Sequence, residues 1–180
     1  AGLSTKNLNI VIISDPSLNA FATTSGKVFI HSGLLTKSKT PNEVIGILAH
    51  EIGHIKNGHA ITRRSQIDKA NLTSALALIA GIGATTVGIY SDNRNIGMAG
   101  QGLTMGMKNS AKRNLLSYTR SQEYEADLAA VNLLLKTGNS SKGLISTLQF
   151  LADSSLVSAK YINPYELTHA APPDRINMIK

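Results

Sequence analysis

A chain of 180 residues is long enough for one domain with a buried core, and 4% aromatic residues without tryptophan predict a mainly aliphatic core. The absence of cysteine excludes a disulfide framework and any thiolate metal site. The net charge of +7 comes from scattered Lys and Arg residues without interleaved aromatic platforms for bases. This pattern argues against nucleic acid as a partner and favours a basic face turned toward anionic lipid.

The N-terminal part of the chain is predicted to form a small sheet. The apolar, β-branched run from Leu8 to Ser14 is typical of a buried strand. The segments NAFATT and KVFIHSG flank Ser25-Gly26, a dipeptide that favours a turn, so a hairpin is expected. The opening AGLSTKN has no apolar core, so we expect no signal sequence here and interpret the chain as a fragment or processed form.

A helix is predicted to follow the hairpin. In the stretch TPNE, Thr40 suits the N-cap, Pro41 suits the first helical position, and Glu43 completes a capping box. The helix is expected to run from Pro41 to about Arg64, with an apolar stripe along one face.

The middle of the chain has no charged residue from Asn71 to Ser91. Leu72–Tyr90 is about 19 residues long, just enough to span a bilayer. Its small residues favour instead a helical insertion at about 71–108 that packs over the functional site and touches a membrane. Within it, the Gly- and Met-rich stretch Ile96–Met107 is interpreted either as a mobile lid or as an irregular loop.

The C-terminal part is predicted to be helical. A long helix is expected from Lys112 to Lys136, with Gly138 as its C-terminal stop. A shorter helix should cover about Ser141–Asp153, and a loop containing Pro164 should lead into a last helix. Because no internal repeat or linker divides the chain, one domain over residues 1–180 is expected.

The stretch GILAHEIGHIKNGH carries the strongest chemical signal. On a helix His50 and His54 lie on one face, so both rings can bind one metal ion, while Glu51 can act as the general base of a zinc hydrolase. His59 cannot join them while the helix continues, because it lies about 140° around the axis from His54. We therefore interpret His59 as a polar residue at the solvent edge.

A third metal ligand is expected in the stretch RSQEYEADLAA. Glu123 and Asp127 are four residues apart and share one helix face. One carboxylate can complete the metal site, and the other can accept the free N–H of a ligating histidine. Alternatively, both acids belong to a solvated helix face. Glu125 points elsewhere and is expected to face solvent.

These blocks together resemble the zinc endopeptidases grouped with the CAAX prenyl proteases, HtpX and the BepA-type periplasmic proteases. The resemblance covers nearly the whole chain through NAFATTSGKVFIHSGLL, HEIGHIKNGH, TRSQEYEAD and THAAPPDRI. It implies one Zn²⁺ per chain, with Glu123 as third ligand and Asp127 as partner of a zinc histidine. It also assigns His169 and Arg175 to the site. In BepA-type members the late histidine can approach the zinc and restrain activity; alternatively, His169 is a solvated loop residue.

The resemblance implies an α+β, gluzincin-like fold, in which a small β-sheet packs on two long zinc-site helices with its edge strand beside the cleft. The expected function is hydrolysis of extended, unfolded or misassembled proteins, with Glu51 as general base and His169 or Arg175 stabilising the oxyanion. The strand residues Ala20, Phe21 and Ala22 would bind substrate by backbone pairing, unless neighbouring strands already satisfy them.

Two other functions remain open from the sequence. One is a largely latent, zinc-containing chaperone-like or membrane-assembly factor, and the other is a membrane-interaction module with a chance histidine cluster. By resemblance, we expect a bacterial protein that is periplasmic or membrane-associated. Its partners would include a membrane surface or outer-membrane assembly machinery. Whether tetratricopeptide repeats follow Lys180, as in BepA-type members, is left open by the sequence.

Overall fold

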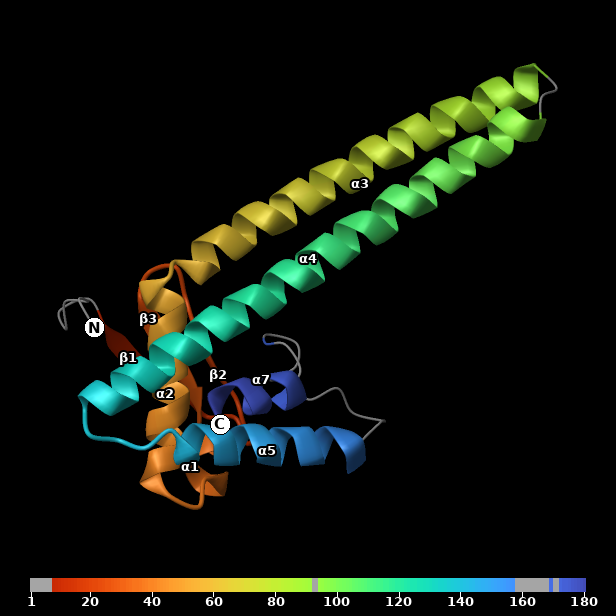
Figure 1. Ribbon diagram of the computed structural model, residues 1–180. Helices are drawn as coiled ribbons and strands as arrows, with labels where there is room; N and C mark the ends of the chain where they lie inside the picture. The colour runs from red at the N-terminus through yellow and green to blue at the C-terminus, as the bar shows by residue number, and fades with distance from the viewer. Residues whose placement is uncertain (1–7, 92–93, 158–168, 170–171) are drawn as a thin grey trace. The chain divides into compact units, whose positions relative to one another are not determined.

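The computed structural model describes residues 8–91, 94–157, 169 and 172–180 (Figure 1). Contacts divide the chain into two compact units, Ala1–Ile61 with Thr119–Lys180, and Thr62–Tyr118. The elements, in chain order, are β1 (Asn9–Ile13), β2 (Ala20–Ala22), β3 (Lys27–His31), α1 (Ser32–Lys37), α2 (Pro41–Lys56), α3 (His59–Tyr90), α4 (Arg94–Lys136), α5 (Lys142–Val157) and α7 (Pro172–Ile179).

A three-stranded sheet in the order β1-β3-β2 forms the β part of the first unit. The predicted hairpin is confirmed: β2 and β3 are antiparallel, with Phe21 opposite Phe29 and their rings stacked at a centroid distance of 5.1 Å. Gly26 in the turn has a φ of 78°, a value that favours glycine. The small sheet among helices agrees with the α+β class expected from the sequence.

The prediction that Leu8–Ser14 is a buried strand is wrong in one respect. The strand forms, as β1, but Ile10 is 47% and Ile12 is 62% exposed. β1 lies at an edge of the sheet, where it pairs with β3 in parallel. An apolar, β-branched run predicts a strand, but it does not reveal whether another element will cover the strand's outer face.

Helix α2 begins as predicted, with Thr40 at the N-cap and Pro41 in the first turn. The Thr40 side chain makes no capping hydrogen bond. Instead, Glu43 accepts the Lys39 backbone N–H at 2.6 Å and the Ser146 hydroxyl at 2.7 Å, which joins the start of α2 to α5. This carboxylate therefore stabilises both the first helical turn and the helix–helix contact.

The expected continuation of this helix to about Arg64 is wrong. Helix α2 ends at Lys56, and Gly58 adopts a φ of 66°, a left-handed conformation that glycine tolerates best. Helix α3 then begins at His59. The chain therefore changes direction between His54 and His59, and the helical angle that separated the two side chains no longer applies.

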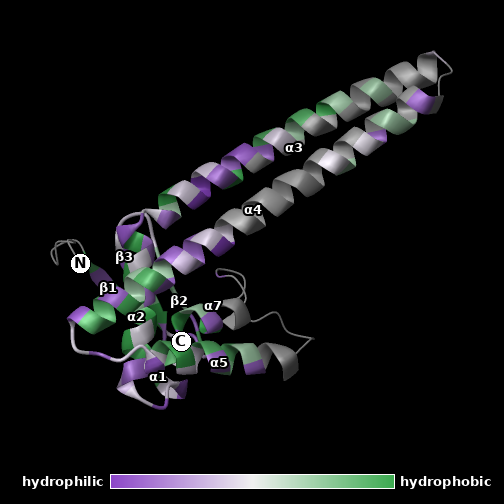
Figure 2. Cartoon of the chain, viewed as in Figure 1, coloured by the Kyte–Doolittle hydropathy of each residue, from purple (hydrophilic) through white to green (hydrophobic). Residues whose placement is uncertain are grey.

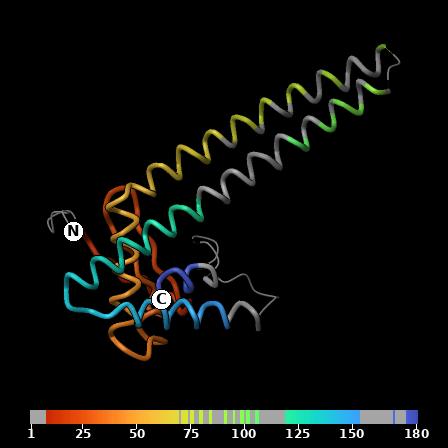
Figure 3. The backbone as a smooth tube through the Cα atoms, in the orientation of Figure 1, coloured from red at the N-terminus to blue at the C-terminus, as the bar shows by residue number. Residues whose placement is uncertain are grey.

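The core of the first unit lies where α2 packs against α5 and β2 (Figures 2 and 3). Fully buried aliphatic residues from the sheet, α1, α2, α4 and α5 fill it, including Val28, Leu34, Ile47, Leu134, Leu144 and Leu148. At Gly53 a Cβ atom would lie 2.6 Å from the Ala126 carbonyl oxygen. This glycine therefore allows α2 and α4 to approach closely, one residue before His54.

The second unit contains most of α3 and the first part of α4. The uncharged segment is helical, and Figure 2 shows α3 becoming more hydrophobic beyond its first turns. Ile96–Met107 is not an irregular loop but part of α4, which starts at Arg94 rather than Lys112. Among the described residues, no helix combines the length and apolarity that a membrane crossing requires.

The C-terminal predictions agree with the structure where it describes them. Helix α4 ends at Lys136 and is followed by Gly138 with a φ of 71°. Helices α5 and α7 correspond to the shorter and the last predicted helices. The loop expected around Pro164 lies outside the described residues.

Candidate metal centre

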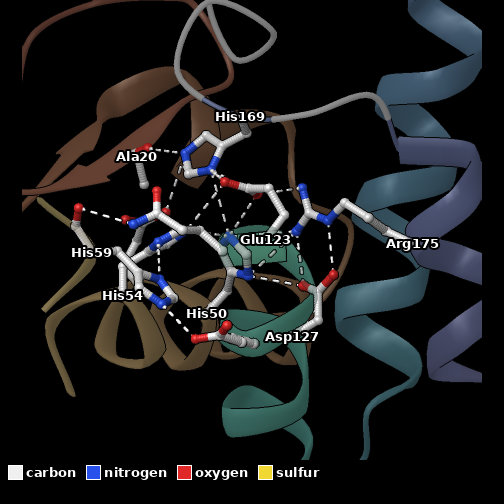
Figure 4. Close-up of polar contacts among 11 residues, drawn as sticks. Ala20, His50, His54, His59, Glu123, Asp127, His169 and Arg175 are labelled. Atoms are coloured by element: carbon white, nitrogen blue, oxygen red, sulfur yellow. Dashed lines mark hydrogen bonds and ion pairs between the residues drawn. The ribbon is translucent and has the colours of Figure 1, made fainter. Parts of the chain in front are cut away.

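Four parts of the sequence meet in the interior of the first unit (Figure 4). Helix α2 contributes His50, Glu51 and His54, and α4 contributes Glu123 and Asp127. His169 and Arg175 complete the group, and Arg175 belongs to helix α7. Every one of these side chains is buried, although charged groups are rarely buried without partners.

Four of these residues can offer ligand atoms to one ion. The candidate atoms of His50, His54, Glu123 and His169 all lie within 4.8 Å of one another. The two Nε2 atoms of His50 and His54 are 3.0 Å apart, and Glu123 carboxylate oxygens lie 3.3 Å and 3.4 Å from them. His169 Nδ1 lies 3.1 Å from Glu123 Oε2. Imidazole nitrogens with a carboxylate oxygen form a donor set that suits zinc.

Asp127 and Arg175 surround this group. Asp127 Oδ1 lies 2.8 Å from His50 Nδ1, which leaves Nε2 of that ring directed toward the other donors. Arg175 donates from Nε and Nη2 to the two Asp127 oxygens, each at 2.8 Å, and its Nη1 lies 3.0 Å from Glu123 Oε2. The guanidinium therefore holds two carboxylates at once, in the bidentate geometry that arginine favours.

Glu51 lies beside the donor group with 1% of its surface exposed. Its Oε1 has no hydrogen-bond partner within the described part of the chain, and His169 Nε2 lies 3.5 Å away. A buried carboxylate oxygen normally finds a hydrogen-bond donor. Here the oxygen is available to a ligand of the metal, so the donor set and this atom together fit a catalytic zinc site.

His59 is the site residue that the sequence interpretation missed. It is 3% exposed rather than at the solvent edge, and its Nδ1 lies 2.9 Å from His54 Nδ1. Its Nε2 lies 3.2 Å from Oε2 of Glu125, whose side chain is 57% exposed as expected. The Asn57-Gly58 dipeptide, a common turn signal, could have revealed the helix break that brings His59 inward.

Comparison with known proteins agrees with this geometry. A sequence profile of peptidase family M48 matches residues 1–180. The chain is 33% identical over 171 residues to a putative beta-barrel assembly-enhancing protease of Vibrio cholerae, with 92% of this chain and 32% of the relative covered.

The chain belongs to peptidase family M48. Its other relatives include metalloprotease YcaL of Escherichia coli, 31% identical over 81% of this chain and 51% of the relative. A protease HtpX homolog of Ligilactobacillus salivarius is 29% identical over 87% of this chain and 58% of the relative. The chain spans about a third of the beta-barrel assembly-enhancing protease and just over half of these two. The resemblance inferred from the four sequence blocks is thus confirmed, and zinc is the cofactor that this M48 donor set takes.

Burial and neighbouring charges shift the pKa values of His50, His54 and Glu123 in this site. Burial and Arg175 lower the pKa of His50, but Asp127 and Glu123 outweigh them and raise it to about 9. Burial, and then the charge of His50, hold the pKa of His54 well below its usual value. Although burial opposes it, the pKa of Glu123 is well below its usual value because His169 and His50 face the carboxylate. Without metal, the site thus holds a proton on His50 that a zinc ion would replace.

Proposed function

We propose that this chain is the catalytic region of a zinc endopeptidase that cleaves extended, unfolded or misassembled proteins. The observation that carries the proposal is the buried meeting of His50, His54 and Glu123 beside a Glu51 oxygen without a hydrogen-bond partner. Membership of family M48 supports the same reading. A structural metal site would not need the Glu51 carboxylate, whose burial is costly.

The residues then divide the chemistry as follows. We assign His50, His54 and Glu123 as zinc ligands; when bound, the metal supplies a Lewis acid that polarises the scissile carbonyl and makes water a better nucleophile. Glu51 accepts the proton of the attacking water and delivers it to the leaving amine. Burial raises the pKa of Glu51 against the opposing charges of His169 and His50, which favours a carboxylate that can both take and release a proton.

The remaining site residues differ in their contacts. Asp127 fixes the His50 ring, and Arg175 acts through Asp127 and Glu123, so we assign both as positioning residues. For Arg175 this replaces the contact with the oxyanion expected from the sequence, because three of its nitrogens already face carboxylates. His169 lies 3.4 Å from the Ala20 carbonyl oxygen and 3.5 Å from Glu51, so it is our candidate for stabilising the oxyanion.

The substrate is proposed to pair with β2. This strand is an edge of the sheet, and it packs against α2, the helix that carries His50 and His54. The His31 N–H donates to the Asn19 carbonyl oxygen, and the Thr23 N–H donates to the Lys27 carbonyl oxygen. These two bonds fix which residues of β2 hydrogen-bond to β3. Phe21 therefore hydrogen-bonds to β3, whereas Ala22 directs its peptide groups to the outer edge; the Ala20 carbonyl oxygen also points outward but faces His169 Nε2 at 3.4 Å. Such an edge binds extended chains with little regard for sequence.

Replacing Ala22 with proline should weaken substrate binding without removing zinc. Proline deletes the outward N–H, which is worth about 1 kcal/mol or roughly a fivefold rise in KM, and an edge strand tolerates it. Steady-state cleavage of an unfolded peptide substrate would measure this, with Ala22→Val as the control that keeps the N–H. An unchanged KM in Ala22→Pro, with zinc retained, would contradict pairing at this residue.

The proposed activity itself is tested on the purified chain. We expect about one zinc per chain and cleavage of unfolded casein but not of a stably folded protein of similar size. Chelation should abolish cleavage, and added zinc should restore it. Zinc without cleavage would favour the latent factor, in which His169 completes the metal coordination and restrains activity. No bound zinc, even after zinc is supplied, would overturn the metallopeptidase proposal.

The relatives suggest a cellular setting for this activity. Several of them are named beta-barrel assembly-enhancing protease. We infer that this protein acts in a bacterial periplasm or at a membrane, on misassembled proteins of the outer-membrane assembly machinery. An unselective strand edge suits such substrates, because misassembled proteins share exposed backbone rather than a common sequence.

A further inference from the structure

We propose that His59, supported by Glu125, positions the zinc ligand His54 by fixing its proton on Nδ1 and its ring orientation. The inference rests on the proposed function in one respect, namely that His54 binds zinc through Nε2. In this arrangement His59 accepts a hydrogen bond from the His54 nitrogen that faces away from the metal, as Asp127 does from the corresponding nitrogen of His50. Metal-binding histidines generally need such a partner on the nitrogen that does not face the metal.

The backbone places His59 for this task. The turn at Gly58 starts α3 immediately beside the end of α2, and the His59 carbonyl accepts a hydrogen bond from Gln122 Nε2 at 3.2 Å. Gln122 precedes the ligand Glu123 on α4. His59, the first residue of α3, is therefore bonded to the segment of α4 that contributes the third zinc ligand. This bond helps to keep the His59 ring in the buried site.

The hydrogen bonds define one consistent arrangement of protons. His54 Nε2 faces the donor group, 3.0 Å from His50 Nε2 and 3.4 Å from Glu123 Oε1. A ring that binds metal through Nε2 carries its proton on Nδ1, and this proton can be donated to His59 Nδ1 at 2.9 Å. His59 then carries its own proton on Nε2 and donates it to Glu125 Oε2 at 3.2 Å. A carboxylate thus supports the second zinc histidine through an intervening imidazole.

The two zinc histidines are supported unequally. His50 contacts a carboxylate that is fully buried, whereas the chain of bonds from His54 ends at a carboxylate whose side chain is 57% exposed. Because solvent screens the exposed charge, the His59 ring should contribute more to zinc binding than Glu125 does. Loss of a partner of this kind commonly weakens metal binding by about 10–100-fold.

Zinc affinity, measured by competition with a chromophoric chelator, tests the inference. We expect His59→Ala to weaken binding about 10–100-fold, His59→Asn to restore part of the loss because its amide oxygen can accept the His54 proton, and Glu125→Gln to have a smaller effect. Asp68→Asn, which changes an exposed acid on α3, serves as the control. Cobalt substitution should also shift the visible spectrum in the His59 variants alone.

The outcomes separate this inference from the proposed function. A wild-type chain that binds no zinc would overturn the ligand assignment, whereas wild-type affinity in a folded His59→Ala variant would overturn only the role of His59. Nitrogen-15 NMR of the zinc-loaded wild-type chain decides the matter even if His59→Ala does not fold. We expect protonated Nδ1 on His54 and protonated Nε2 on His59; a proton on Nδ1 of His59 contradicts the proposal.

Discussion

Glu51→Gln should slow peptide hydrolysis by about 10²–10⁴-fold while zinc stays bound. Glutamine preserves the size of the side chain, but it cannot accept the proton of the attacking water. Since Glu51 is not among the grouped metal ligands, the zinc content should remain that of the wild-type chain. Metal analysis beside initial rates on unfolded casein measures both parts of the prediction.

The control for Glu51→Gln is Glu123→Gln, which changes an equally buried carboxylate of the same site. Only the Glu123 variant should lose zinc affinity. Thermal unfolding of both variants shows whether either change acts through folding, because Glu51 accepts no hydrogen bond at Oε1 and its replacement should cost little stability. A Glu51→Gln protein that retains zinc and cleaves casein at the wild-type rate would exclude Glu51 as the general base.

Arg175→Met should lower the free energy of unfolding of the zinc-free protein by about 3–5 kcal/mol. The arginine is 1% exposed and binds Asp127 and Glu123, neither of which has measurable exposure. Methionine fills a similar volume but leaves the two buried carboxylates without this cation. Zinc loading should recover part of the loss, because the ion supplies positive charge next to Glu123. Urea unfolding with and without zinc measures the difference.

The pH dependence of this loss follows from Asp127. Although burial opposes it, the hydrogen bonds from Arg175 lower the pKa of this carboxyl. The stabilisation is therefore complete above the unfolded pKa near 4 and is lost as pH falls through the lower folded value. The difference between wild type and Arg175→Met should shrink at acidic pH. Arg175→Lys keeps the positive charge but loses the planar guanidinium that binds two oxygens at once, so its free energy of unfolding should lie between those of wild type and Arg175→Met. Equal stability of all three proteins would contradict the positioning role.

Regular helical geometry made much of the candidate site predictable from the sequence. His50 and His54 share a face of α2, and Glu123 and Asp127 share a face of α4, because both pairs have a spacing of four residues. The structure brings all four together. The edge position of β2 and the involvement of His169 and Arg175 came instead from resemblance, since no local pattern connects residues as far apart as Arg175 and Asp127, which are 48 positions from each other.

The missed features depend on single residues or on tertiary contacts. Gly58 ends α2 and changes the position of His59, and the prediction of a helix to Arg64 did not take the Asn57-Gly58 turn signal into account. The exposed face of β1 depends on which elements cover the sheet, which strand propensity does not encode. The contacts of Arg175 with Asp127 and Glu123 depend on how α7 packs, which only the folded chain defines.

The order of the candidate metal ligands along the chain has a further consequence. His54 and Glu123 lie in the first unit, yet the whole second unit, Thr62–Tyr118, is inserted between them in the sequence. Because this unit is compact and held together by its own contacts, a change in its length need not disturb the packing of the first unit. Evolution could therefore lengthen, shorten or exchange the helical hairpin in steps, adapting the enzyme to new surroundings while its chemistry is inherited unchanged.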